Sequence, residues 1–204
     1  MTEADLARIG SAVAEAERRT RAEIVVVVNR RSGSYLDREA VFASLFALFV
    51  LWALVFSVWE FDQDLLILWV VLAWLVGIGL AKWRPVRARL LGARRRDRQV
   101  LLHARNAFHA AHVGGTRERT GLLVYASLEE DRVVLLPDYG IEGKVEPAAW
   151  TGILDRVGPL SASANPPEAL CRIVAECGTV LAERLPRAEG DVDELPNRPM
   201  TGVA

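Results

Sequence analysis

The chain has 204 residues, which is enough for one domain of ordinary size. Hydrophobic residues make up 51% of it, and the formal net charge at pH 7 is −1. A nearly neutral chain has no global electrostatic attraction for nucleic acid, so we expect no nucleic-acid partner. Much of the apolar excess lies between Val41 and Trp83, which predicts that this segment lies in a more apolar environment than the rest of the chain.

The N-terminal segment, Met1 to Thr20, is polar and helical in pattern. Four apolar residues recur at the spacing of one helix face: Leu6, Ile9, Val13 and Ala16. They predict an amphipathic helix over residues 4–18. Because this segment has no apolar stretch and no small-residue cleavage site, we expect no signal peptide. The next run, Ala22 to Asn29, reads AEIVVVVN and is typical of a central strand buried on both faces.

Two apolar runs follow, and we interpret them as transmembrane spans at 41–59 and 65–83. The first has no charged residue and, as a helix, would reach about 28 Å, close to the ~30 Å hydrocarbon core of a bilayer. In the second, Lys82 and Trp83 extend the apolar part by snorkelling and interfacial anchoring. The alternative is a pair of buried core helices. A domain of this size could hardly cover two helices that are apolar on all sides.

The charges around these runs predict their direction. The connection from Glu60 to Asp64 is short and acidic, so the two helices should form an antiparallel hairpin. The outer flanks are basic: Arg30, Arg31, Arg38, Lys82, Arg84, Arg87, Arg89, Arg94, Arg95, Arg96 and Arg98. The positive-inside rule then predicts a protein of the cell's inner membrane, with both termini and the soluble domain in the cytoplasm.

The Arg-rich stretch after the second span has two interpretations. Six of its residues are candidates for binding anionic lipid at the membrane surface: Arg84, Arg87, Arg89, Arg94, Arg95 and Arg96. Each would contribute roughly 1 kcal/mol of attraction near an anionic leaflet. The simpler interpretation is a stop-transfer flank with no further role.

Beyond the hairpin the elements alternate again. Helical patterns cover 98–112, 147–158 and 166–185. Strand patterns cover 121–127 and 132–137, and the short charged turn between them predicts antiparallel pairing. The tail after Pro186 is rich in proline and acidic residues, which predicts flexibility.

This order of elements predicts an α/β fold: a three-layer α/β/α domain with a mixed sheet, interrupted by a two-helix transmembrane hairpin. The expected parts are 1–38 with the first helix and strand, 41–83 as the hairpin, 98–187 as the remainder of the domain, and 188–204 as a flexible tail. No G-x-G-x-x-G follows the first strand, so the fold is not that of a dinucleotide-binding unit.

Several motifs follow one another between Arg105 and Val145: a helix near Phe108, the strand sequence GLLVYAS ending at Ser127, a charged turn, the strand RVVL, and the loop from Asp138 to Gly143. Their order resembles that of the TPM domain family. The loop is similar to the family's glycine-aromatic-glycine-aliphatic-Glu-Gly signature, with Asp138 in place of its first glycine. The inserted hairpin departs from the plainer members.

The resemblance implies an α/β/α domain and a role connected with membranes. Some members of the family look like assembly or repair factors for membrane complexes. Some bind calcium, and a plant member is linked to acid phosphatase activity. Many of these domains face away from the cytoplasm, which is opposite to the direction that the charge rule predicts here.

Asp138 and Glu142 are the candidate metal ligands. They follow a strand, in a loop with glycines, and carboxylates on such a turn suit Ca²⁺ or Mg²⁺. A bound metal could polarise a phosphate. A simple glycine turn is the alternative, because a usual site needs more carboxylates. The acidic turn from Glu129 to Asp131 should lie at the other end of the strand pair and so outside this site.

Other residues capable of chemistry lack a supporting pattern. His103, His109 and His112 fall on one predicted helix, where His109 and His112 are three residues apart and share a face. A transition metal would need a third ligand, and none has suggestive spacing. Cys171 and Cys177 are six residues apart on a predicted helix and therefore on different faces, which predicts free thiols. The spans carry no charged residue, which is unfavourable for a transporter.

The sequence favours a non-enzymatic, membrane-anchored module that binds another membrane protein or complex and aids its assembly or maintenance. The alternative is a metal-dependent, phosphatase-like hydrolase at the membrane surface. The lipid bilayer is an expected partner under both hypotheses. The sequence does not decide whether the chain forms a homo-oligomer.

Overall fold

The computed structural model describes residues 1–32, 36–57, 65–83, 86, 92–163, 165–188 and 194–202. The chain forms two compact units. The first combines Met1–Ser32 with Asp97–Ala204, and the second is Gly33–Arg96. The chain of the first unit is therefore interrupted by the second unit.

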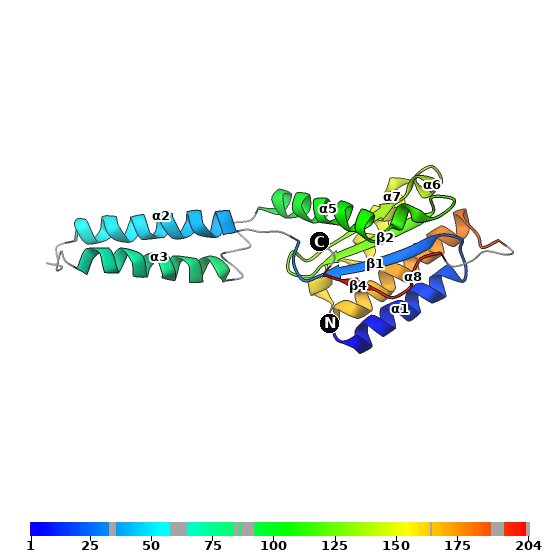
Figure 1. The fold of residues 1–204 in the computed structure, drawn as a ribbon, viewed down its shortest axis with the longest axis horizontal. Helices are drawn as coiled ribbons and strands as arrows, with labels where there is room; N and C mark the ends of the chain where they lie inside the picture. The colour runs from blue at the N-terminus through cyan, green and yellow to red at the C-terminus, as the bar shows by residue number, and fades with distance from the viewer. Residues whose placement is uncertain are drawn as a thin grey trace. The chain divides into compact units, whose positions relative to one another are not determined.

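The first unit contains a mixed sheet of four strands in the order β3-β2-β1-β4 (Figure 1). Its strands are β1 (Glu23–Asn29), β2 (Gly121–Ser127), β3 (Arg132–Pro137) and β4 (Met200–Thr201). β1 is parallel to both β2 and β4, whereas β2 and β3 are antiparallel, with Leu122 opposite Pro137 and Ser127 opposite Arg132. The predicted α/β class and mixed sheet are confirmed.

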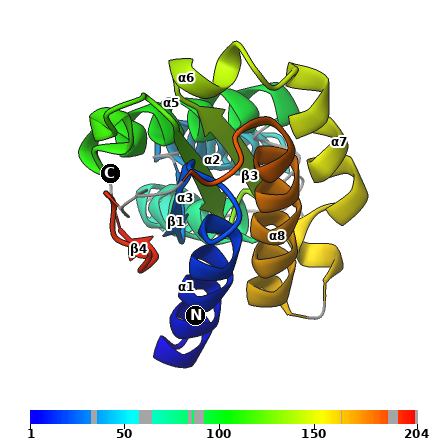
Figure 2. The same cartoon turned by 90° about the vertical axis from the view of Figure 1, so that its right-hand side faces the viewer.

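Helices cover both faces of this sheet. They are α1 (Glu3–Glu17), α5 (Ala93–Ala110), α6 (Tyr139–Glu142), α7 (Pro147–Val157) and α8 (Pro166–Arg184), with short 3-10 turns η2 (Val113–Gly115) and η3 (Leu160–Ala162). One face of β1 and β2 packs with α1, α7 and α8, and the other packs with α5. Figure 2 shows α1 and α8 side by side against the sheet. Every residue of β1 and β2 is buried, as a two-sided core requires.

Within the C-terminal tail, for which flexibility was expected over 188–204, the described residues 194–202 contact β1. Met200 and Thr201 form β4 beside β1, and Gly202 N donates to Asn29 Oδ1 at 2.9 Å. Further back, the buried Glu23 carboxylate accepts from Glu194 N at 3.2 Å and from Leu195 N at 3.3 Å. Composition indicated disorder because it ignores such partners, which are supplied by residues far away in the sequence.

The second unit consists of α2 (Leu36–Val55) and α3 (Leu66–Lys82), packed against each other. The contact uses small residues: a Cβ at Gly77 would lie 2.8 Å from Ala43 Cα, and Ala47, Ala73 and Ala81 are buried. Trp74 Nε1 also donates to Ser44 Oγ at 3.3 Å. Larger side chains such as Ile67, which is 77% exposed, cover the outer surface.

By length and composition, Asp37–Val55 is able to cross a bilayer, and only 17% of it is buried. The other helix, Leu66–Lys82, is apolar but has 17 residues. The first helix begins before the predicted span at 41, and the acidic connection at 60–64 lies outside the described residues.

Candidate functional site

The loop after β3 is built around Asp138. Its backbone N donates to Gly121 O at 2.8 Å and so completes the ladder between β2 and β3. Its side chain is the N-cap of α6, where Oδ1 accepts from Tyr139 N at 2.9 Å. Only 2% of this side chain is exposed. Asp138 therefore has a structural role in the turn, whatever else it binds.

Arg119 supplies the charge that the buried Asp138 carboxylate requires. Its Nε lies 3.0 Å from Asp138 Oδ2 as an ion pair, although without hydrogen-bond geometry, and its Nη1 donates to Gly114 O at 3.0 Å. Its guanidinium carbon is 5.7 Å from the centroid of the Tyr139 ring. The backbone of Arg119 has φ 58°, in the left-handed region. Such strain persists only where surrounding contacts enforce it.

Two glycines let the backbone segments approach around this pair. A Cβ at Gly140 would lie 2.3 Å from Glu118 O, and a Cβ at Gly121 would lie 2.2 Å from Val113 O. Gly140 N also donates to Arg119 O at 2.9 Å. The glycines of the predicted loop motif are thus required by close packing against the turn that carries Arg119.

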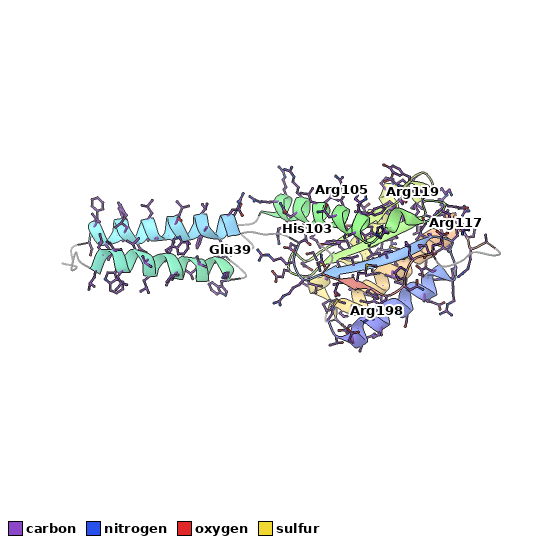
Figure 3. All side chains as sticks on the ribbon, in the orientation of Figure 1. Glu39, His103, Arg105, Arg117, Arg119 and Arg198 are labelled. Atoms are coloured by element: carbon purple, nitrogen blue, oxygen red, sulfur yellow. The ribbon has the colours of Figure 1, made fainter. Side chains whose placement is uncertain are left out.

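A cavity of about 270 Å³ opens beside this pair. Its lining combines two arginines, a histidine and two acids with apolar side chains: Arg105, Phe108, His109, Arg119, Leu136, Pro137, Asp138, Tyr139 and Glu142. Arg105 comes from α5 and Arg119 from the loop before β2 (Figure 3). Sequence reasoning missed both arginines because they are distant from the acidic loop along the chain.

Asp138 and Glu142, the predicted metal ligands, do line this same cavity. However, within the described residues no group of three or more His, Cys, Asp or Glu side chains is placed to hold a metal ion. Asp138 instead faces a guanidinium, which competes with a cation for the same oxygen. The donor set found there is poor for Ca²⁺ or Mg²⁺, each of which takes about six or more oxygen ligands.

The acidic turn 129–131 lies at the opposite end of the strand pair, as expected from its position between β2 and β3. There Glu130 is buried and accepts from Ser32 N at 3.1 Å and from Ser127 Oγ at 2.5 Å. Ser32 Oγ in turn contacts Tyr125 Oη at 2.7 Å. This network holds Ser32, the last residue of the first unit before the chain enters the second unit.

The predicted lipid-binding arginines are described only in part. Arg84, Arg87 and Arg89 lie outside the described residues. Arg94, Arg95 and Arg96 are on the first turns of α5, where Arg95 Nη2 pairs with Asp37 Oδ2 at 2.9 Å. One positive charge of the flank is thereby balanced by an acid at the start of α2.

Both cysteines are free, as predicted. Burial raises the pKa of the Cys177 thiol to about 12, with the nearby Glu176 adding to the effect. Burial also raises the pKa of Cys171, which is half-buried. Raised values keep a thiol protonated at neutral pH, so neither has the character of a nucleophile.

No protein-family model matches the sequence, and no curated protein matches it either. A solved structure with a similar fold is the NMR structure of the BA42 protein from the psychrophilic bacterium Bizionia argentinensis. The TM-score is 0.61 at 20% sequence identity, and the match covers 99% of this chain and 95% of that chain. Similarity at this level shows the fold alone. The resemblance to TPM domains stays a prediction.

Proposed function

We propose that the protein is a non-enzymatic, membrane-anchored module that binds another membrane protein or complex and aids its assembly or maintenance. The observation that carries the proposal is the inserted pair of helices. Its small residues are used in the contact between α2 and α3, while its large apolar side chains stay exposed. Such an outer surface suits lipid or another transmembrane segment and is costly in water.

In this proposal both helices cross the bilayer, as spans 41–59 and 65–83, and the termini are cytoplasmic. Basic residues at both outer ends of the pair support this direction. In the first unit, Ser32 contacts Glu130 in the turn between β2 and β3, and Asp97 pairs with Arg132 at the start of β3. A hairpin returns the chain to the side that it left, which is what a domain divided in this way requires.

The first test is affinity purification of the full-length protein from its own membranes in mild detergent, with mass spectrometry of the bound proteins. We expect a reproducible, nearly stoichiometric membrane partner. An empty purification, repeated after cross-linking, would contradict the binding function. Reporter fusions at the C-terminus test the direction separately, and an external reporter would overturn it.

A metal-dependent phosphatase is a second candidate, favoured by the arginines and the histidine that share a cavity with Asp138 and Glu142. Guanidinium groups are good phosphate ligands. The candidate predicts hydrolysis of p-nitrophenyl phosphate with Ca²⁺ or Mg²⁺, abolished by Glu142→Gln with the fold intact. The Glu142 side chain is exposed and makes no hydrogen bond or ion pair in the described part of the chain, so this variant tests the chemistry of the carboxylate and not the stability of the fold. If purified protein neither binds these metals nor hydrolyses the ester, the candidate is lost.

A further inference from the structure

β3 is an edge strand, and one side of its backbone has no partner among the described residues. β2 pairs with its inner side, and no strand of the described chain lies beyond it. Hydrogen-bonded and non-hydrogen-bonded positions alternate along an antiparallel pair of strands. Asp138 is hydrogen-bonded to Gly121, so the backbone groups of every second residue before it, Leu136, Val134 and Arg132, point toward β2. The backbone groups of Val133, Leu135 and Pro137 therefore point outward.

The outward groups are two donors and three acceptors. Val133 and Leu135 each present an N–H and a C=O, whereas Pro137 presents only a C=O. Within the described residues none of these groups takes part in a hydrogen bond. Unpaired edge groups are a ready template for an added strand.

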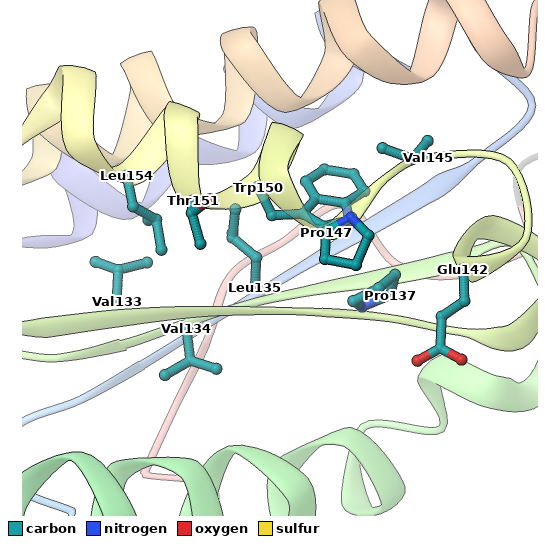
Figure 4. Close-up of a pocket in the computed structure, with 10 residues that line it drawn as sticks. All are labelled: Val133, Val134, Leu135, Pro137, Glu142, Val145, Pro147, Trp150, Thr151 and Leu154. Carbon is teal, nitrogen blue, oxygen red and sulfur yellow. The ribbon is translucent and has the colours of Figure 1, made fainter. Parts of the chain in front are cut away.

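An apolar groove lies along this edge, as Figure 4 shows. Its volume is about 540 Å³. Val133, Leu135 and Pro137 line it from the strand, and Trp150, Thr151 and Leu154 line it from α7. Val134 also belongs to the lining, although its side chain points to the other face of the sheet (Figure 4). A strand added beside β3 would place alternate side chains in this groove, because side chains alternate along a strand.

The two ends of the groove differ in charge. Near Arg132 the turn is bound to η3, since Asp131 accepts from Ser161 N at 2.8 Å and from Ser161 Oγ at 2.5 Å, and Arg132 pairs with Asp97. At the Pro137 end, Glu142 lines the groove, is exposed, and makes no ion pair in the described part of the chain. Glu146 nearby in sequence is also exposed and unpaired there, so two glutamates outnumber Lys144 within residues 142–146, whereas Arg105 and Arg119 line the neighbouring cavity described above.

A second copy of the chain fits this edge poorly. In antiparallel pairing of β3 with β3, the two β1 strands would run in opposite directions. Ser32 and Asp97, where the chain passes to the inserted unit, lie at one end of the sheet. Their counterparts in the second copy would then lie at the other end of the joined sheet. Two copies inserted in the same bilayer are not expected to pair in this way.

We propose that the β3 edge and its groove bind an extended segment of a partner protein by strand addition. The segment is apolar at alternate positions and carries a lysine or arginine at the end next to Glu142. Main-chain hydrogen bonds to Val133, Leu135 and Pro137 supply affinity, and the groove under α7 selects the side chains. This inference rests on the proposed binding function, for which it names the contact surface.

The test uses full-length protein in detergent micelles and capped peptides of about eight residues, in which Val, Ile, Leu or Phe alternates with Thr and a lysine stands at one end. Thr151→Arg fills the groove from an exposed position. Thr179→Arg on α8 is its matched control, since both threonines are exposed helical residues whose Oγ1 donates to a backbone carbonyl at 3.0 Å.

We expect saturable binding to wild type, protection of the Val133 and Leu135 amides from hydrogen exchange, and an affinity lowered about tenfold or more by Thr151→Arg. Thr179→Arg should bind as wild type does. A peptide whose lysine is replaced by glutamate should bind wild type more weakly than the lysine peptide does. The Glu142→Lys variant should bind the glutamate peptide more tightly than the lysine peptide. Three results would overturn the inference. They are no binding by any peptide, binding to Thr151→Arg as tight as to wild type, and binding of a backbone N-methylated peptide as tight as that of the unmethylated one.

The same variants separate this inference from the proposed function. If wild type and Thr151→Arg retain the same membrane partner during purification, the binding function stands and the groove is not its site. If no partner is retained but the peptides bind at β3 as expected, the groove is a site and the membrane-complex function fails.

Discussion

Arg119 and Gly140 form a close backbone contact at the candidate site. The left-handed conformation of Arg119 costs a non-glycine residue about 1–3 kcal/mol, and the contact with the Gly140 backbone helps to hold it. We predict that Gly140→Ala lowers the free energy of unfolding by about 2 kcal/mol, because the new Cβ meets backbone atoms that have no room to move.

Gly143→Ala is the control for this substitution. Gly143 has φ −77° and no atom within 4 Å of an added Cβ, so its replacement should change stability by less than about 0.5 kcal/mol. Denaturant unfolding followed by circular dichroism measures both variants. Equal effects of the two would contradict the packing argument.

The two thiols should differ in reactivity. Cys177 is buried with its pKa raised to about 12, whereas Cys171 is half-buried. Since the thiolate fraction grows only as pH approaches the raised pKa, we expect native Cys177 to stay unlabelled by iodoacetamide at pH 8 while Cys171 reacts slowly. Mass spectrometry after labelling gives the result, and rapid native labelling of Cys177 would refute it. Unfolded protein should react at both positions.

At the scale of elements, the α2–α3 pair depends on Gly77. We predict that Gly77→Leu separates the helices, because even a Cβ there would lie 2.8 Å from Ala43 Cα. The readout is an oxidative cross-link between Ala47→Cys and Ala73→Cys, two buried positions that the antiparallel contact of Gly77 with Ala43 places opposite each other. The cross-link should form in the parent and fail in the variant.

Gly79→Leu provides the control, because no atom lies within 4 Å of a Cβ at Gly79. It should leave the cross-link unchanged. Loss of the cross-link in both variants would indicate that leucine harms α3 itself and not the contact between the helices.

The elements of the domain were predictable to different degrees. β1 and β2 follow from unbroken apolar runs, and the helices follow from their periodicity. The cover of the β1 edge by residues 194–202 was not predictable, since it depends on Glu23 and Asn29 as distant partners of the tail backbone. Local composition contains no information about such contacts.

At the scale of the whole molecule, the inserted unit should be removable. Ser32 contacts Glu130 in the turn between β2 and β3, and Asp97 pairs with Arg132, the residue that follows this turn. We predict that replacing residues 33–96 with roughly ten Gly and Ser residues yields a folded domain that no longer sediments with membranes. Amide exchange reports the fold through protection of β1 and β2.

Two results would contradict this prediction. A replaced protein that still sediments with membranes would show that the first unit binds them by itself. A soluble protein without protected β1 amides would show that the sheet needs the inserted helices.

Sequence alone determined the α/β class, the mixed sheet, the apolar insertion and the free thiols, because each depends on periodicity or spacing within a short stretch of chain. The tertiary structure decided that Arg119 and Arg105 join Asp138 and Glu142 at one cavity, that residues 194–202 lie along β1, and that β3 is an exposed edge beside a groove. These features arise where segments distant in sequence meet, and the packing of the whole chain alone specifies which segments meet.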